Sequence, residues 1–119
     1  MTASAFSLTL TLENSAFHII KGTPVLGGLH GPTQHFYCGH CKSWLFTRPE
    51  GLEQYVNLRA TMLDDASWFE PYVETWTNEQ LPWAQTAATH SFATQPEIAD
   101  YARLTSEYAE RGARPTRAH

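Results

Sequence analysis

The sequence predicts a mainly β protein, built from small antiparallel sheets and closed by one C-terminal α-helix. Three observations predict this fold class. Apolar and polar side chains alternate near the start of the chain, and glycine and proline residues interrupt the chain at short intervals. Helical spacing of apolar side chains begins only at Pro96. The 119 residues, 42% of them hydrophobic, are enough for one modest core.

The first predicted strand lies within residues 6–13, where Phe6, Leu8, Leu10 and Leu12 alternate with polar residues. A turn at Asn14 and Ser15 leads into a second predicted strand over residues 17–21. The glycines and prolines of residues 22–32 then break the chain strongly.

Further short strands are expected at residues 33–37, 44–48 and 55–62. In the last of these, Asn57 and Arg59 share one face, and the apolar residues share the other. Residues 63–68 predict a turn with Asx capping, followed by a strand over residues 71–77 and an irregular segment to about Phe92.

The C-terminal helix is expected to begin near Pro96, with Ile98, Tyr101 and Tyr108 on one side, and to stop at Gly112. We therefore expect a domain over residues 1–95, a helix over residues 96–111 packed on it, and a flexible tail over residues 112–119.

Composition makes several function classes improbable. The formal net charge of −4 and the lack of a basic run argue against nucleic-acid binding. The apolar runs are too short to span a membrane, and the first residues lack the features of a secretory signal. We expect a cytoplasmic protein with reduced thiols, in which a pair of cysteines binds metal or takes part in catalysis.

Cys38 and Cys41, the only two cysteines, form a C-x-x-C motif that supplies half the ligands of a tetrahedral zinc site. The histidines considered as further ligands are His30, His35, His40 and His90. Free thiols that bind no metal are the alternative, and it stays open.

The tetrapeptide Cys-Gly-His-Cys also matches the dithiol of protein disulfide isomerases. That chemistry requires a helix N-terminus, which lowers the pKa of the first thiol. Residues 42–48 predict a strand instead, and no βαβ pattern surrounds the motif, so the dithiol oxidoreductase hypothesis is disfavoured.

Several segments resemble the glutathione-dependent formaldehyde-activating enzyme family, also called the CENP-V/GFA domain. The resemblance covers about residues 1–95, and its segments are residues 38–49, 56–61, 63–65, 67–71, 74–76 and 81–84. It implies a β-tent fold pinned by zinc. It also implies a carbon–sulfur lyase activity of the S-(hydroxymethyl)glutathione synthase type, which joins glutathione to formaldehyde.

The resemblance also implies roles for the cysteines. Family members usually carry an early C-x-C, a middle C-x-C-x-x-C that holds the catalytic zinc, and a later C-x-x-C that completes a structural zinc site. Only the last is present here, as Cys38 and Cys41, so this chain matches the C-terminal part of the family domain. We expect it to lack catalytic residues and activity. Met1 resembles an internal methionine of the family pattern.

Four residues are predicted to bind a glutathione-like small molecule: Asn57, Arg59, Trp68 and Trp83. For Arg59 the alternative is an ion pair with Asp64, Asp65 or Glu74. Trp44 and Trp76 are expected in the core. The alternative function is a non-catalytic β-tent domain for binding or assembly, in which a homodimer shares zinc through Cys38 and Cys41.

Overall fold

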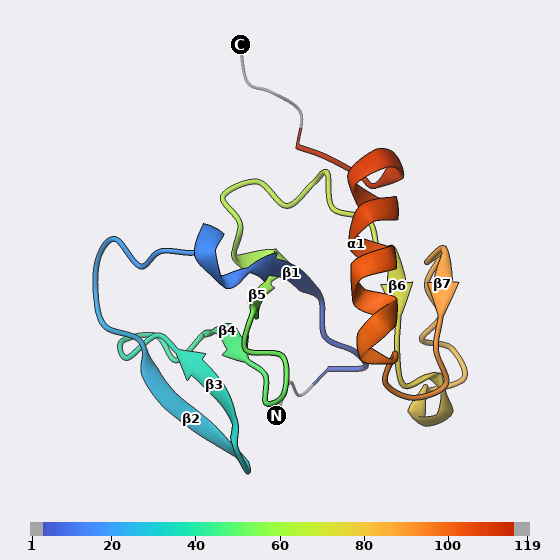
Figure 1. The fold of residues 1–119 in the computed structure, drawn as a ribbon. Helices are drawn as coiled ribbons and strands as arrows, with labels where there is room; N and C mark the ends of the chain where they lie inside the picture. Colours follow the sequence, from blue (N-terminus) through green and yellow to red (C-terminus); the bar gives the residue numbers. More distant parts are fainter. Residues whose placement is uncertain (1–3, 116–119) are drawn as a thin grey trace. The chain divides into compact units, whose positions relative to one another are not determined.

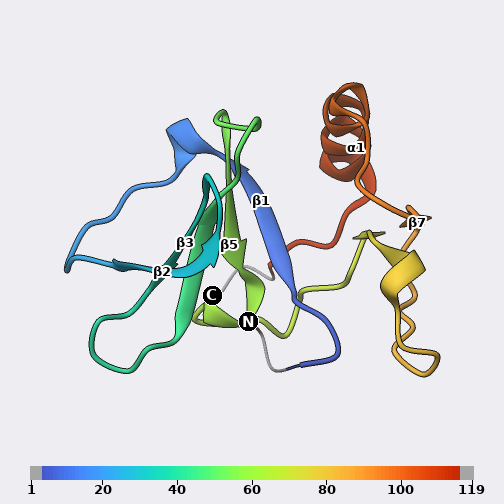
Figure 2. The same ribbon diagram turned by 90° about the horizontal axis from the view of Figure 1, so that it is seen from below.

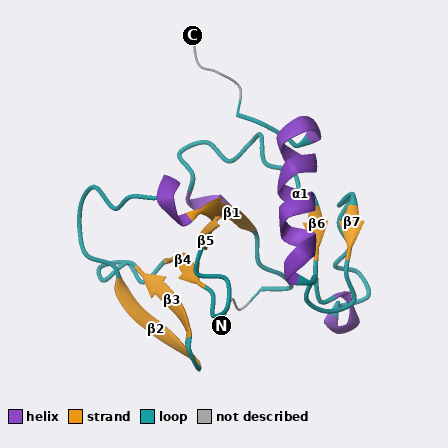
Figure 3. Ribbon diagram, in the orientation of Figure 1, coloured by secondary structure: helices purple, strands orange, loops and turns teal. Residues whose placement is uncertain are grey.

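The computed structural model describes residues 4–115, apart from the side chains of residues 28–30. These residues form two compact units, one of residues 7–64 and the other of residues 65–115 with residues 4–6. The first unit holds a five-stranded antiparallel sheet, and the second holds a pair of two-residue strands and one α-helix (Figures 1 and 3). The prediction of a mainly β fold with a C-terminal helix is confirmed. The predictions about Met1 and the last tail residues, 116–119, lie outside the described residues.

The five-stranded sheet has the order β1-β5-β4-β3-β2, with β1 and β2 at its two edges (Figure 1; Figure 2 shows the same ribbon from below). Its strands are β1 (Thr9–Glu13), β2 (Val25–His30), β3 (Thr33–Tyr37), β4 (Trp44–Arg48) and β5 (Tyr55–Arg59). The predicted bounds of β3 and β4 are confirmed. Because side chains alternate along each strand, the register places an apolar set on one face and a polar set on the other.

The core of the first unit lies on the apolar face. Phe46 of β4 and Val56 of β5 are 3% and 0% exposed. The Phe46 ring stacks on Phe36 at 4.8 Å between centroids, and it meets Phe17 at 4.9 Å. This face therefore carries the burial that stabilises the sheet.

The predicted strand over residues 17–21 is wrong, because this segment is an irregular connection. It joins β1 to β2, which lie at opposite edges of the sheet. Four strand spacings of about 4.8 Å separate these edges, which makes a distance of about 19 Å. Phe17 turns inward onto Phe46, whereas Ile20 is 97% exposed. A segment that must cross the end of the sheet has no neighbouring strand with which to pair.

The edge strand β2 lies where the glycines predicted only a break in the chain. Glycine at position 27 lets β2 pack beside Tyr37 of β3, because a Cβ at this position would stand only 3.0 Å from the Tyr37 ring. The register shifts between Gly27 and His30, as at a β-bulge. Gly31, with φ +62°, then makes the turn into β3.

The predicted strand over residues 55–62 ends three residues early. β5 stops at Arg59, and Ala60–Met62 form a 3₁₀ turn whose first residue is 1% exposed. The amide of Ala60 donates to the carbonyl of Leu8 at 3.3 Å. The turn therefore closes the end of β5 against the segment that precedes β1.

In the second unit, the strand predicted over residues 71–77 is reduced to β6 (Val73–Glu74). It pairs in parallel with β7 (His90–Ser91), which the sequence did not predict. Trp76 follows β6 with φ +57° and is 49% exposed, so its predicted place in the core is wrong. Its indole instead donates to the side chain of Gln95 at 3.2 Å.

The helix α1 (Ile98–Arg111) ends as predicted, but it begins two residues later than the predicted start at Pro96, with Glu97 as its N-cap. The amide of Glu97 donates to Asp100 Oδ2 at 3.0 Å, which caps the first turn. Leu104 is the buried residue of this helix. Ile98, which was predicted to face inward, is 69% exposed. Gly112 is required at the C-terminus, since a Cβ there would stand 2.3 Å from the Tyr108 ring.

Candidate metal half-site and polar sheet face

Cys38 and Cys41 lie in a tight turn between β3 and β4, which we call the thiol knuckle (residues 38–43). The amide of Lys42 donates to the carbonyl of Cys38, and the amide of Cys38 donates to the carbonyl of Ser43, both at 2.9 Å. The amide of Cys41 points to Cys38 Sγ at 3.5 Å. Lys42 adopts φ +64°, a conformation uncommon for residues other than glycine. The chain therefore turns so that amides face sulfur, as thiolate ligands require.

The thiol of Cys41 has a lowered pKa. In the thiol form Cys41 Sγ–H donates to Ser43 Oγ at 3.2 Å, and in the thiolate form the Ser43 hydroxyl donates to the sulfur. Hydrogen bonding from the hydroxyl of Ser43, then from its amide and from Cys38, lowers the pKa of Cys41 to about 7. The side chain is exposed. A thiol of this acidity is ready to bind metal near neutral pH.

The knuckle by itself does not make a complete zinc site. A structural zinc needs four ligands in a tetrahedron, and the described residues contain no group of three or more His, Cys, Asp or Glu side chains that could hold a metal. The two thiols fit half of such a site, and no catalytic three-thiolate site can be built from two cysteines.

The histidines considered as ligands have other surroundings. His35 is buried on β3, and its Nδ1 shares a hydrogen bond with Thr47 Oγ1 at 2.8 Å. His90 is in the second unit and contacts Glu107. His40 is exposed within the knuckle, and the side chain of His30 lies outside the described residues.

The polar face of the sheet gathers a connected set of side chains around Trp44. Its indole nitrogen donates to Thr47 Oγ1 at 3.2 Å, and its ring meets His35 edge-on at 5.2 Å between centroids. On β5, Asn57 Oδ1 accepts the hydroxyl hydrogen of Thr11 at 2.9 Å. We call this set the polar face: Thr9, Thr11, His35, Trp44, Thr47, Asn57 and Arg59.

Arg59 is the only cation of the polar face. Its guanidinium carbon lies 4.1 Å from the centroid of the Trp44 ring, and Nη1 reaches Thr9 Oγ1 at 3.4 Å. Burial lowers the pKa of Arg59. Among the described residues of its own unit, no carboxylate forms an ion pair with it, Asp64 included. Arg59 is thus a half-buried cation held by an aromatic ring and a hydroxyl.

The two acidic residues proposed as alternative partners of Arg59 belong to the second unit and are engaged there. Asp65 accepts hydrogen bonds from the amide and hydroxyl of Ser67 at 2.9 and 2.6 Å, which confirms the predicted Asx turn. Glu74 accepts from the hydroxyls of Thr86 and Ser91, each at 2.7 Å.

The predicted ligand-binding tryptophans also belong to the second unit. Trp68 is half-buried beside Phe69, with 6.2 Å between ring centroids, and Trp83 is 73% exposed. The structure thus brings Asn57 and Arg59 together on one sheet face and describes Trp68 and Trp83 in a separate unit. Their role in binding stays a prediction.

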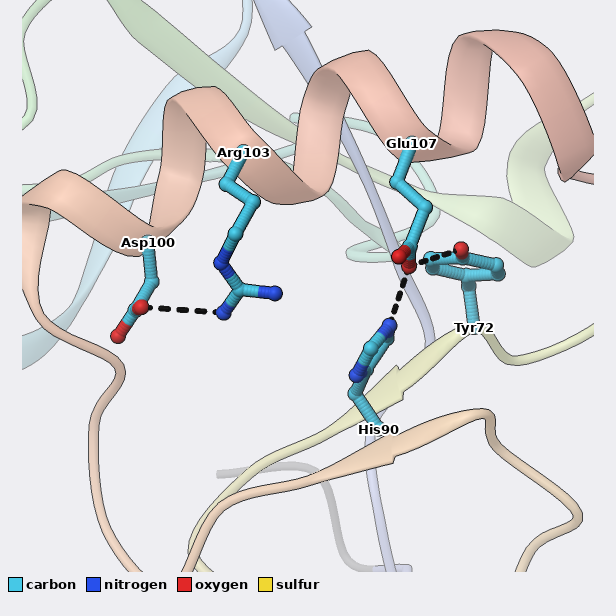
Figure 4. Close-up of polar contacts among 5 residues, drawn as sticks. All are labelled: Tyr72, His90, Asp100, Arg103 and Glu107. Atoms are coloured by element: carbon cyan, nitrogen blue, oxygen red, sulfur yellow. Dashed lines mark hydrogen bonds and ion pairs between the residues drawn. The ribbon is translucent and has the colours of Figure 1, made fainter.

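A second polar cluster, which sequence reasoning missed, ties α1 to the strands of its unit (Figure 4). Glu107 Oε2 accepts hydrogen bonds from the hydroxyl of Tyr72 and from Nε2 of His90. These two bonds, the one from Tyr72 first, lower the pKa of Glu107. On the same helix, Asp100 pairs with Arg103 at 3.1 Å. The cluster fixes the helix to its own unit rather than forming a metal site.

The fold and the knuckle together define a small antiparallel β domain that carries a dithiol turn. The chain belongs to the family described as glutathione-dependent formaldehyde-activating enzyme, whose family model matches residues 1–79. The match includes the knuckle and the polar face and ends before the run Leu81–Ala84. The comparisons with curated proteins and with solved structures found no match. Of the helices in residues 4–115, none is long and apolar enough to cross a membrane.

Proposed function

We propose that this chain binds a glutathione-like thiol on its polar face and does not itself catalyse the carbon–sulfur step of its family. The observation that carries the proposal is Arg59, a half-buried cation stacked on Trp44 without a carboxylate partner in its unit. Burying part of a charge costs free energy unless an anion offsets it. A carboxylate of the ligand would supply that anion and accept two parallel hydrogen bonds from the guanidinium.

Asn57 extends the proposed contact. Its side-chain oxygen already accepts the hydrogen of Thr11, so its amide nitrogen is the end left to donate to a ligand oxygen. A tripeptide with two carboxylates and two amides matches a surface that offers a guanidinium and an amide donor. The family, with its glutathione-dependent activity, supports this ligand class.

The absence of lyase activity follows from the thiol count. A catalytic zinc with three thiolates supplies Lewis-acid polarisation when it is bound, but the 119 residues contain two cysteines, both in the knuckle. We therefore assign the chain binding rather than catalysis. As part of the same proposal, the chain corresponds to the C-terminal part of the family domain.

Titration of the protein with glutathione, followed by calorimetry and by the NMR signal of the Trp44 indole, tests the binding. Arg59→Lys keeps the charge and removes the two-pronged hydrogen bonding, so affinity should fall about tenfold or more. Arg48→Lys is the matched control, because Arg48 also lies over an aromatic ring, Phe46 at 5.5 Å, but on the opposite face. Unchanged affinity in Arg59→Lys, with lowered stability, would show a structural role.

The catalytic part of the proposal is tested separately. Mixing glutathione and formaldehyde with the zinc-loaded protein should give S-(hydroxymethyl)glutathione no faster than the uncatalysed reaction, as measured by exchange NMR. An acceleration that disappears on chelation would contradict it.

A further inference from the structure

The knuckle has the geometry of a metal-binding turn but only half of the ligands. Its two sulfurs are held between β3 and β4 by backbone hydrogen bonds, and Cys41 is exposed. The described residues supply no third ligand, and zinc needs four. A zinc ion bound to the knuckle would therefore need two further ligands from outside the described residues.

We propose that a second copy of this chain completes the site, so that two knuckles related by a twofold axis bind one zinc through Cys38 and Cys41 of each copy. A twofold axis brings identical surfaces together, so the same turn supplies both halves. Four thiolates around Zn²⁺ carry a net charge of −2. The two exposed Lys42 side chains, one from each copy, offset that charge beside the metal.

The surface next to the knuckle suits a self-contact. Val25 begins the edge strand β2, and its Cγ1 is 3.4 Å from where a Cβ on Gly39 would stand, which places it against the knuckle. Val25 is 41% exposed. Two copies joined at the metal would bring the two Val25 side chains toward each other and remove them from water.

This inference does not depend on glutathione binding. The zinc content and the oligomeric state are measured without any thiol ligand, so failure of one proposal leaves the other standing. If zinc joins two chains, the apparent affinity for zinc should rise with the protein concentration, because the metal and the second chain bind together.

Native mass spectrometry of the full chain, purified in a non-thiol reductant and titrated with zinc, tests the proposal. The expected species is a dimer with one zinc, which chelation converts to monomers. One zinc on a monomer, a zinc-free dimer that resists chelation, or a folded chain that takes up no zinc would each overturn it. Cobalt(II) adds a second measurement, because thiolate-to-cobalt charge-transfer absorption should correspond to four thiolates per metal.

Two variants separate the metal from the surface. Cys38→Ser should abolish both zinc uptake and dimerisation while circular dichroism shows that the sheet remains folded. Val25→Glu leaves both thiols in place and should weaken the zinc-bound dimer about tenfold or more. Trp83→Glu is the matched control, an exposed apolar residue of the second unit, and should leave the dimer unchanged. Equal weakening by both variants would show that the apolar surface at β2 is not part of the interface.

Discussion

The guanidinium of Arg59 lies over the indole of Trp44, with 4.1 Å between the Arg59 Cζ atom and the ring centroid. The two residues come from neighbouring strands, β5 and β4, and the contact is on the polar face rather than in the apolar core. Such a contact stabilises a partly desolvated cation by about 0.5–2 kcal/mol. Trp44 therefore does two things at once: it supports the sheet through Thr47 and it holds the Arg59 guanidinium in position.

Trp44→Leu should lower the free energy of unfolding by about 1–3 kcal/mol, because it removes the ring under Arg59 and the hydrogen bond to Thr47. Urea unfolding followed by circular dichroism measures the loss. Trp83→Leu, at a position that is 73% exposed, should change stability by no more than about 0.5 kcal/mol. Similar losses in the two variants would mean that Trp44 is not engaged as described.

Val56→Ala should be destabilising by about 2–3 kcal/mol, because Val56 is 0% exposed at the centre of the apolar face. Ile20→Ala provides the comparison at a position that is 97% exposed. Thermal and urea unfolding of both variants would reveal the difference. A small effect at Val56 would place the core elsewhere than between β4 and β5.

The alkylation rate of Cys41 in metal-free, reduced protein should rise with pH and reach half its maximum near pH 7, where the pKa of the thiol lies. Ser43→Ala removes the largest cause of that low pKa, so the midpoint should move to higher pH. Peptide mapping by mass spectrometry separates modification at Cys41 from modification at Cys38. An unmoved midpoint would show that Ser43 does not stabilise the thiolate.

Glu107→Gln should destabilise the protein at pH 7, and the difference from the parent should shrink in acid. The pKa of Glu107 is lowered in the folded state from 4.5, so its stabilising contribution is complete above that value and is lost as pH falls through the lower, folded pKa. Unfolding curves between pH 7 and pH 3 check the sign. Glu110→Gln, an exposed site on α1, should show no such dependence. A deficit that does not change with pH would contradict the ionic role.

The elements that the sequence predicts well are those whose signal is local. β3 and β4 have alternating side chains between strong breakers, and α1 has a capping residue and a terminal glycine, so their bounds follow from short-range rules. β2 could not be predicted, because its glycines read locally as breakers, and the close approach of the Tyr37 ring to Gly27 involves a different strand. β7 has two residues and is defined by pairing with β6 alone.

The same distinction holds for the site. The spacing of Cys38 and Cys41 is enough to predict the knuckle, since the motif is contiguous. The ring beneath Arg59 belongs to a residue on another strand, and only the register between β4 and β5 reveals it. The cluster at Glu107 joins residues 17 and 35 positions apart in sequence, with no motif to mark them.

The pairing of β1 with β5 also affects how the chain is made. Thr9 pairs with Arg59, so β1 must wait for a partner strand that is synthesised about 50 residues later. At about 5–20 residues per second, that wait lasts roughly 3–10 s. The hairpins of β2, β3 and β4 are complete before then, which leaves the apolar face without its β1 edge. Nascent chains stalled before β5 should thus bind holdase chaperones, and release should coincide with the emergence of Arg59.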